Sequence, residues 1–218
     1  MSDISNEIKQ QCAEVSFDAS RPLIISDADE VLLQFMVQFE HYLDKQDLWI
    51  DLQSFKLNGN IKHKGTQKQA DVNMPDLLDA FFASETPHFT PVDGAAESLS
   101  MLSEHAQIVV LTNLPLAQRQ ARQENLKQNG MDYPVIVGSG PKGPAVKWIA
   151  QNVDAPIFFL DDIFHNINSV ADHAPQTHRI HMIADQRLRK MMNAAEKAST
   201  RIDDWPVARH WILETLTR

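Results

Sequence analysis

Residues 23–29 read Leu-Ile-Ile-Ser-Asp-Ala-Asp, so a short apolar run ends directly on two carboxylates that are two positions apart. A continuous apolar run without polar alternation is typical of a strand buried on both faces of a parallel sheet. Carboxylates that follow such a strand are costly to desolvate unless they are paired or bind a metal. We therefore interpret Asp27 and Asp29 as part of a functional site, with a helix N-terminal cap as the simpler alternative.

Three more apolar runs, at residues 108–111, 135–137 and 157–160, repeat this pattern, and residues 177–183 are a candidate for a fifth strand. Segments with apolar residues at helical spacing alternate with them, and one such segment begins directly after Asp29. This alternation predicts an α/β fold: a three-layer, doubly wound and mostly parallel sheet with right-handed crossovers. In such sheets, ligands bind beyond the carboxyl ends of the strands.

About 80 residues separate Asp27 from the second apolar run, whereas a crossover needs only about a dozen. We therefore expect a small, mostly helical insertion over residues 34–88, and a core domain formed by residues 1–33 and 89–218. Within the insertion, residues 75–82 carry a helical pattern, and residues 52–57 are a candidate for a second helix. We expect the polar first 20 residues to be loosely held.

The composition excludes several classes of protein. The chain has 218 residues, 43% of them hydrophobic, and a net charge of -9, which argues against a nucleic-acid partner because phosphate backbones are bound by clustered Lys and Arg. Its single cysteine, Cys12, fits a reducing compartment. We recognise neither a signal peptide nor a run of about 20 apolar residues that would span a bilayer. We therefore expect a cytoplasmic enzyme acting on a small molecule without a membrane partner, and the sequence does not indicate an oligomeric state.

Polar residues that suit phosphate chemistry follow the apolar runs in a fixed order. They are Asp27 and Asp29, then Thr112 and Asn113, then Lys142, then Asp161 and Asp162. This set resembles the four motifs of the haloacid dehalogenase-like hydrolase superfamily, which correspond here to residues 25–32, 111–113, 142–144 and 159–162. The resemblance covers residues 22–170. It implies a Rossmann-like core of the phosphatase type with a small helical cap between the first and second motifs.

The resemblance also implies catalytic roles. Asp27 would be the nucleophile that forms an aspartyl-phosphate, and Asp29 would protonate the leaving alkoxide and later deprotonate the attacking water. Thr112 and Asn113 would bind the phosphoryl oxygens. Lys142 would neutralise both Asp27 and the transferring group.

The same resemblance implies a Mg²⁺ cofactor, an ion that takes oxygen ligands. Its ligands would be the carboxylate of Asp27, the main-chain carbonyl of Asp29 and the carboxylate of Asp162. Asp161 or Asn166 would orient bound waters.

The implied function is magnesium-dependent hydrolysis of a small phosphorylated metabolite. Asp29 favours phosphate esters over carbon–halogen bonds, because only an alkoxide needs a proton. Three alternatives remain open: a phosphotransferase or mutase, a phosphatase of the 5'-nucleotidase type, and a catalytically silent metabolite-binding member.

Two features lie outside the motif pattern. Glu30 stands where the superfamily most often has Gly, at a point where we expect the backbone to turn, and it is a candidate substrate contact. Lys62, His63, Lys64 and Lys68 form a basic patch that would either contact an anionic leaving group or lie in a solvated loop.

Overall fold

The computed structural model describes residues 4–54 and 56–217. Within them, one sheet has six strands, all paired in parallel, in the order β5-β4-β1-β6-β7-β8. Its strands are β1 (Leu23–Ser26), β4 (Gln107–Asn113), β5 (Val135–Gly138), β6 (Ile157–Asp161), β7 (His178–His181) and β8 (Thr200–Arg201). The predicted fold class and the five predicted strands are confirmed, and the short edge strand β8 was not predicted.

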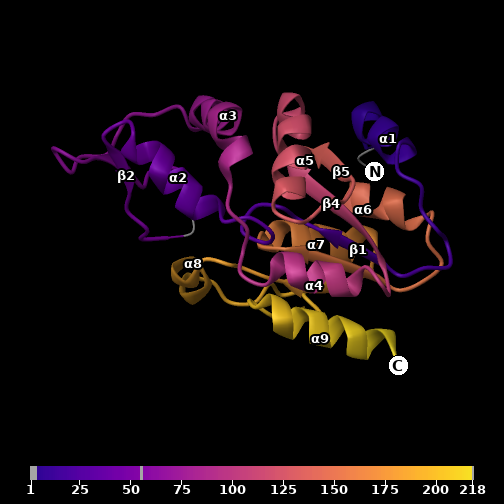
Figure 1. The fold of residues 1–218 in the computed structure, drawn as a ribbon. Coiled ribbons are helices and arrows are strands. Elements are labelled where there is room, and N and C mark those ends of the chain that lie inside the picture. The colour runs from indigo at the N-terminus through magenta and orange to yellow at the C-terminus, as the bar shows by residue number, and fades with distance from the viewer. Residues whose placement is uncertain (1–3, 55, 218) are drawn as a thin grey trace.

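Helices cover both faces of this sheet, which makes three layers (Figure 1). Side chains of α1 (Asn6–Ala13), α6 (Gly143–Ala150) and α7 (Phe164–His173) join one apolar cluster with Ile25. Those of α4 (Ala95–Leu102), α5 (Arg119–Gln128) and α9 (Trp205–Leu216) join a second cluster with Ile24. Successive residues of β1 therefore face opposite layers, as a strand buried on both sides requires.

The register of the central strands places the first and fourth motifs side by side. Ser26 at the end of β1 pairs with Val110 of β4 and with Leu160 of β6. The amide of Asp27 donates to the carbonyl of Leu160 at 2.9 Å. The chain therefore leaves β1 and β6 at the same edge of the sheet, next to the end of β4.

The insertion stands at the left of Figure 1, beyond the edge of the sheet where the motifs gather. It contains α2 (Phe35–Asp44), β2 (Leu48–Ile50), β3 (Ile61–His63), α3 (Met74–Glu85) and η1 (Thr86–His88). The helix expected over residues 52–57 is wrong for the described residues, because this segment is an irregular connection between the antiparallel strands β2 and β3. Phe55 itself lies outside the described residues. The domain boundaries, residues 34–88 for a cap and 1–33 with 89–218 for a core, stay a prediction.

Two other expectations are corrected. The helix expected directly after Asp29 begins only at Phe35, because residues 28–33 form a turn in which the carbonyl of Ala28 accepts from the amides of Leu32 and Leu33. The N-terminal segment is not loosely held from residue 6 onwards. It forms α1, and the side-chain amide of Gln11 satisfies both main-chain groups of Val137 on the edge strand β5.

The remaining helices are η2 (Leu116–Gln118), which precedes α5, and α8 (Gln186–Met191), which follows β7. Among the described residues, no helix combines the length and the apolar character that crossing a membrane requires.

Candidate active site

A cavity of about 290 Å³ lies at the carboxyl edge of the central strands. The residues that the sequence singled out and that line it are Asp27, Asp29, Glu30, Thr112, Asn113, Lys142, Asp162 and Asn166. They follow β1, end β4, precede α6 and follow β6. Four segments far apart in the chain therefore converge on one space, as the motif order predicted.

Lys142 links two of these segments. Its Nζ lies 2.7 Å from Oδ1 of Asp27 and 2.7 Å from Oδ2 of Asp161, and only 2% of the side chain is exposed. Burial lowers the pKa of Lys142, but the carboxylates of Asp161 and Asp27 outweigh burial and raise it above the usual value. Lys142 therefore carries its charge at neutral pH, held between two strand ends.

The position of Lys142 depends on close packing behind it. Lys142 is the residue before α6, and Gly143 begins that helix. A Cβ on Gly143 would lie 2.3 Å from the carbonyl oxygen of Ser169 in α7, so only glycine permits this approach. On the cavity side, the side-chain amide of Asn113 donates to the carbonyl of Gly140 at 2.8 Å and joins the second motif to the same loop.

Asp161 and Asp162 have different roles in the hydrogen-bond network. Oδ1 of Asp161 accepts from the amide of Ile163 and from Nδ2 of Asn166, and Oδ2 accepts from Lys142. The Asp162 carboxylate makes no hydrogen bond to another residue that the structure describes, and it lines the cavity. Asp161 is therefore a buried partner of Lys142, whereas Asp162 is free to take a ligand.

His181 supports the loop that carries Asp162. Its Nδ1 accepts from the amide of Ala195 at 3.0 Å, so Nε2 carries the proton that is donated to the carbonyl oxygen of Asp162 at 2.9 Å. Burial lowers the pKa of His181. Both ring nitrogens are thus satisfied by main-chain groups in the neutral form.

The acidic residues fit a divalent cation. One carboxylate oxygen from each of Asp27, Asp161 and Asp162 lies within 4.8 Å of the others. Burial and then the carboxylates of Asp161 and Asp27 raise the pKa of Asp162 well above its ordinary value. Three buried carboxylates share one ammonium group, so a second source of positive charge would stabilise their ionised forms. Carboxylate oxygens are ligands that Mg²⁺ prefers.

Two groups in the cavity are open to a ligand. Oδ1 of Asp27 accepts from the amide of Ala28 at 2.6 Å and contacts Lys142, whereas Oδ2 has no hydrogen-bond partner among the described residues. The hydroxyl of Thr112 is fully buried and likewise lacks a partner in the described chain. Such a buried hydroxyl costs about 1–3 kcal/mol if nothing binds it. A bound anion that accepts from Thr112 would remove that cost.

Arg122 is a charged neighbour that sequence reasoning missed. Its guanidinium, on α5, is fully buried, and one nitrogen lies 2.8 Å from Oδ1 of Asp29. The same group lies 4.4 Å from the ring centre of Phe89, at a cation–π distance. Burial raises the pKa of Asp29 to about 6, although Arg122 opposes that rise.

A weak signal for Arg122 exists in the sequence. Residues 119–128 are almost entirely polar, so a helix there has to bury polar side chains on its inner face. Arg122, Asn125 and Leu126 are the residues that it buries. Spacing alone does not distinguish Arg122 from Arg119, because either could begin that face.

Glu30 confirms the expected turn and shows how a residue other than Gly is held there. Its φ is +58°, in the left-handed region. Oε1 accepts from the amide of Met36 at 2.7 Å and Oε2 accepts from the amide of Asp185 at 2.9 Å. Burial raises the pKa of Glu30 to about 7, although these two amides lower it. The carboxylate therefore joins the turn to α2 and to the loop before α8.

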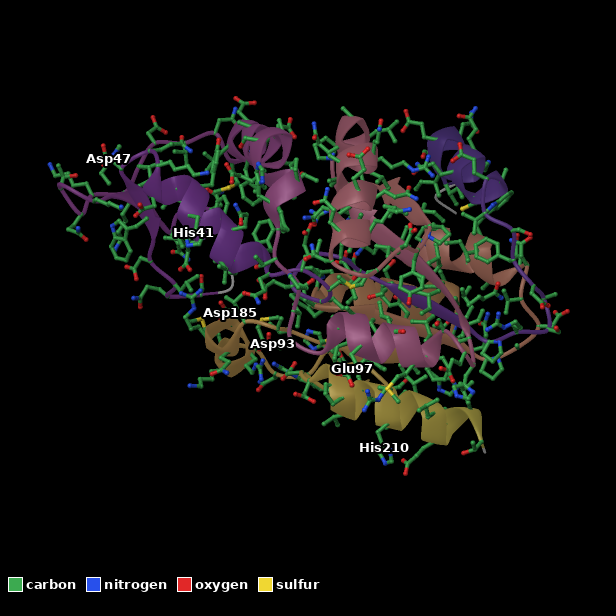
Figure 2. All side chains as sticks on the ribbon, in the orientation of Figure 1. His41, Asp47, Asp93, Glu97, Asp185 and His210 are labelled. Atoms are coloured by element: carbon green, nitrogen blue, oxygen red, sulfur yellow. The ribbon has the colours of Figure 1, made fainter. Side chains whose placement is uncertain are left out.

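Glu30 also separates the catalytic cavity from a second cavity of about 350 Å³, and it lines both. The second cavity is lined mainly by polar residues, which include Arg189 and the aspartates Asp93 and Asp185 that Figure 2 labels near α8. Both oxygens of Glu30 are engaged with main-chain amides, so the structure gives no support to Glu30 as a substrate contact.

The basic patch in the insertion faces elsewhere. Lys62 pairs with Asp51 and Lys64 pairs with Asp44. None of Lys62, His63, Lys64 or Lys68 is among the described residues that line the catalytic cavity. The solvated-loop interpretation of the patch therefore agrees better with the structure.

The wall of the cavity opposite the carboxylates is apolar. It consists of Phe35, Met36, Leu57, Leu78, Phe82 and Leu188, and Ile163 adds an apolar side chain next to Asp162. Most of these residues belong to the insertion, so the cavity is closed by the core on one side and by the insertion on the other.

Comparisons with solved structures agree with this geometry. A haloacid dehalogenase family hydrolase from Deinococcus radiodurans, solved with bound phosphate and sodium, has a TM-score of 0.61 and 14% identity, with 90% of this chain and 97% of that chain covered. The D,D-heptose 1,7-bisphosphate phosphatase from B. bronchiseptica, complexed with magnesium and phosphate, has a TM-score of 0.53 and 15% identity, with 89% and 99% covered.

A haloacid dehalogenase-like hydrolase from Xanthomonas campestris gives a TM-score of 0.57 at 11% identity, with 92% of this chain and 98% of that chain covered. At these identities the similarity shows the fold, and it confirms the predicted superfamily resemblance at that level. No curated protein matches the chain in sequence.

The sequence model of one family matches residues 1–134, more than half of the chain. The match includes β1, the insertion, β4 and α5, and it therefore covers the segments that carry Asp27, Asp29, Thr112 and Arg122. The chain, which has the fold of the haloacid dehalogenase-like hydrolases, belongs to the family described as "Protein of unknown function (DUF2608)".

Proposed function

We propose that this protein is a magnesium-dependent phosphomonoester hydrolase that works through an aspartyl-phosphate on Asp27. The observation that carries the proposal is the arrangement around Asp27. Its Oδ2 is free, its Oδ1 is held by Lys142, and the same cavity contains the unpartnered hydroxyl of Thr112. A nucleophile beside a fixed cation and a free hydrogen-bond donor is the arrangement that phosphoryl transfer needs.

The first half-reaction transfers the phosphoryl group to the protein. Thr112 donates its hydroxyl proton in a hydrogen bond to a phosphoryl oxygen, while Oδ2 of Asp27 attacks phosphorus. The bond between phosphorus and the leaving oxygen breaks, and Asp29 gives that oxygen its proton. Lys142 balances the negative charge that gathers at Asp27 and the phosphoryl oxygens.

The second half-reaction regenerates the enzyme. Asp29, now ionised, takes a proton from water as the water oxygen attacks the phosphorus of the aspartyl-phosphate. The bond to Asp27 breaks, and inorganic phosphate leaves. The guanidinium of Arg122 lies 2.8 Å from one oxygen of Asp29, so its charge stabilises the ionised carboxylate in this step.

Mg²⁺ would be held by the carboxylates of Asp27 and Asp162, with the main-chain carbonyl of Asp29 as a third ligand. When bound, it supplies positive charge that offsets repulsion between the carboxylates and the phosphate. The magnesium and phosphate in the heptose bisphosphate phosphatase and the phosphate in the Deinococcus hydrolase support both ligands for this fold.

The test is release of inorganic phosphate from a broad panel of phosphomonoesters, with MgCl₂ and with EDTA, by the wild type and by Asp27→Asn. We expect turnover that requires Mg²⁺ and is lost in Asp27→Asn. Asp154→Asn is the matched control, because Asp154 is exposed and lies just before the opposite end of β6. The proposal fails if the wild type hydrolyses no ester, or if Asp27→Asn retains turnover.

A further inference from the structure

We propose that the leaving group of the substrate is an apolar or aromatic alcohol, which the insertion recognises by contact and not by hydrogen bonds. This inference rests on the proposed phosphatase function. It narrows the substrate class from phosphorylated metabolites in general to phosphomonoesters without a polyol or a second charged group.

The first observation is the chemistry of the insertion's side of the cavity. Among residues 34–54 and 56–88, those that line the cavity are Phe35, Met36, Leu57, Leu78 and Phe82, and all five are apolar. Leu188 of α8 extends the same wall. A group leaving from phosphorus would therefore meet carbon atoms on the side away from the carboxylates.

The second observation is that this wall is braced. The ring of Phe35 lies 5.3 Å from that of Phe81 in an edge-on arrangement and 6.1 Å from that of Phe82. Phe81 in turn lies 5.5 Å from Phe89. These packed rings join α2, α3 and the start of the next core segment, so the wall presents a fixed aromatic surface and not a set of mobile side chains.

The third observation concerns the polar groups that could have recognised a sugar. Among the described residues of the insertion, no charged residue lines the cavity, and some pair with one another, as in Lys45 with Glu85 and Lys62 with Asp51. On the core side, Glu30 is committed to two main-chain amides. The side-chain amides of Asn113 and Asn166, which also line the cavity, donate to Gly140 and to Asp161. Hydroxyl groups of a polyol buried against this wall would lose hydrogen bonds to water without replacement.

The size of the cavity agrees with a small leaving group. Its volume of about 290 Å³ lies at the lower end of the range of about 300–1,000 Å³ that small-molecule sites span. A phosphoryl group at the carboxylate end leaves room for a single ring or a short chain against Phe35, Leu78 and Phe82. The observations therefore favour a compact alcohol such as an arylmethyl alcohol.

The experiment compares benzyl phosphate with ribose 5-phosphate, both at saturating Mg²⁺. Each releases a primary alcohol, so the two esters differ mainly in what surrounds the leaving oxygen. We expect kcat/KM to be at least about tenfold higher for benzyl phosphate, in line with burial of part of its ring. As a second measurement, benzylphosphonate should inhibit the wild type competitively at lower concentration than inorganic phosphate does.

Leu78→Asn tests the wall directly, with Leu116→Asn as the matched control. Leu78 is half-buried on the cavity, whereas Leu116 is exposed in η2 and lies outside it. We expect Leu78→Asn to reduce the preference for benzyl phosphate severalfold and Leu116→Asn to leave it unchanged. Thermal unfolding shows whether each variant is folded, and the benzylphosphonate measurement on the wild type does not depend on any variant.

Each outcome separates the two proposals. Hydrolysis of neither ester, and of no other ester in the panel, overturns the phosphatase function itself. Equal or faster hydrolysis of ribose 5-phosphate leaves that function standing and overturns the apolar leaving group. A preference for benzyl phosphate that folded Leu78→Asn retains in full overturns the assignment of the wall as its origin.

Discussion

The catalytic edge of the core and the insertion that covers it differ in how far their charged side chains are buried. At the core edge, Lys142 and Asp161 are almost completely buried and hold each other across two segments. In the insertion, the side chain of Lys64 and that of its partner Asp44 are 40% and 68% exposed. This pair thus keeps its charges in water, whereas apolar residues of the insertion line the cavity. We infer that residues of the core carry out phosphoryl transfer and that residues of the insertion select the leaving group.

The largest effect should follow from removing the central charge of the core edge. Lys142→Met leaves Asp27 and Asp161 buried without their cation, which should lower kcat/KM by about 10²- to 10³-fold and the free energy of unfolding by about 3–5 kcal/mol. Steady-state kinetics and urea unfolding measure the two effects. Lys147→Met is the control, since Lys147 is exposed on the same helix. A Lys142→Met variant within tenfold of wild-type activity would contradict the role given to this residue.

The pair of Arg122 and Asp29 tests how much a buried, unpaired charge at the core edge lowers the free energy of unfolding. Burial raises the pKa of Asp29 to about 6, above its unfolded value of about 3.9. The folded state therefore binds the proton of Asp29 more tightly than the unfolded chain does. The stability that protonated Asp29 contributes is present at pH 3 and is lost as pH rises through about 6. Arg122 limits that loss by pairing with the ionised form.

Arg122→Met should consequently destabilise the protein more at pH 8 than at pH 4, by about 3 kcal/mol at the higher pH. Urea unfolding in EDTA at both pH values measures this difference. Arg119→Met is the control on the same helix, because Arg119 pairs with the exposed Glu14. Equal destabilisation by Arg122→Met at the two pH values would mean that Arg122 acts through packing on Phe89 and not through Asp29.

The sequence predicts the residues of the core edge better than it predicts the structure of the insertion. The apolar run before Asp27 and the runs before Thr112 and Asp161 each mark a strand and its end, and parallel strands bring those ends together. The sequence alone therefore predicts that the polar side chains at these strand ends lie close together. The positions of strand ends do not predict Arg122, because it contacts Asp29 from the middle of a polar helix.

The insertion lacks such constraints. The apolar pattern of residues 75–82 identifies α3, but the segment over residues 52–57 has the spacing of a helix, and its described residues form an irregular connection instead. Short strands such as β2 and β3 depend on each other for their hydrogen bonds, so local spacing does not reveal them. Likewise, the apolar side chains of Leu57 and Leu78 could belong to any core, and only the fold turns them toward the carboxylates.

Glu30 and Asp47 offer a paired test of backbone strain in the two regions. Both have positive φ, +58° and +56°, a conformation that costs about 1–2 kcal/mol for residues other than Gly. Glu30→Gly relieves the strain but removes two hydrogen bonds from a carboxylate, each worth about 1.5–3 kcal/mol, so we expect net destabilisation of about 1–5 kcal/mol. Thermal and urea unfolding measure the change.

Asp47→Gly should have the opposite sign. Asp47 is exposed in the insertion (Figure 2), and its side chain makes no hydrogen bond to another described residue. Relief of strain should therefore stabilise the protein by up to about 1 kcal/mol. If Glu30→Gly were also stabilising, the carboxylate of Glu30 would not be holding the turn against α2 and the loop before α8.

The last effect, which appears only at low pH, concerns His181, which ties β7 to the loop of Asp162. Burial lowers its pKa below the ordinary value of 6.5, so the unfolded chain takes up a proton first as the pH falls. The stability contributed by neutral His181 is therefore complete above about pH 6.5 and is lost below it, by at most about 1.4 kcal/mol for each pH unit. His181→Asn should remove this part of the pH dependence when urea unfolding is compared at pH 7.5 and 5.5. His210→Asn should preserve it, because His210 is exposed on α9. An unchanged pH dependence in His181→Asn would show that the loop of Asp162 tolerates a charged imidazole. The sensitivity of the core edge to charge would then be limited to Lys142, to Arg122 and to the carboxylates that they contact.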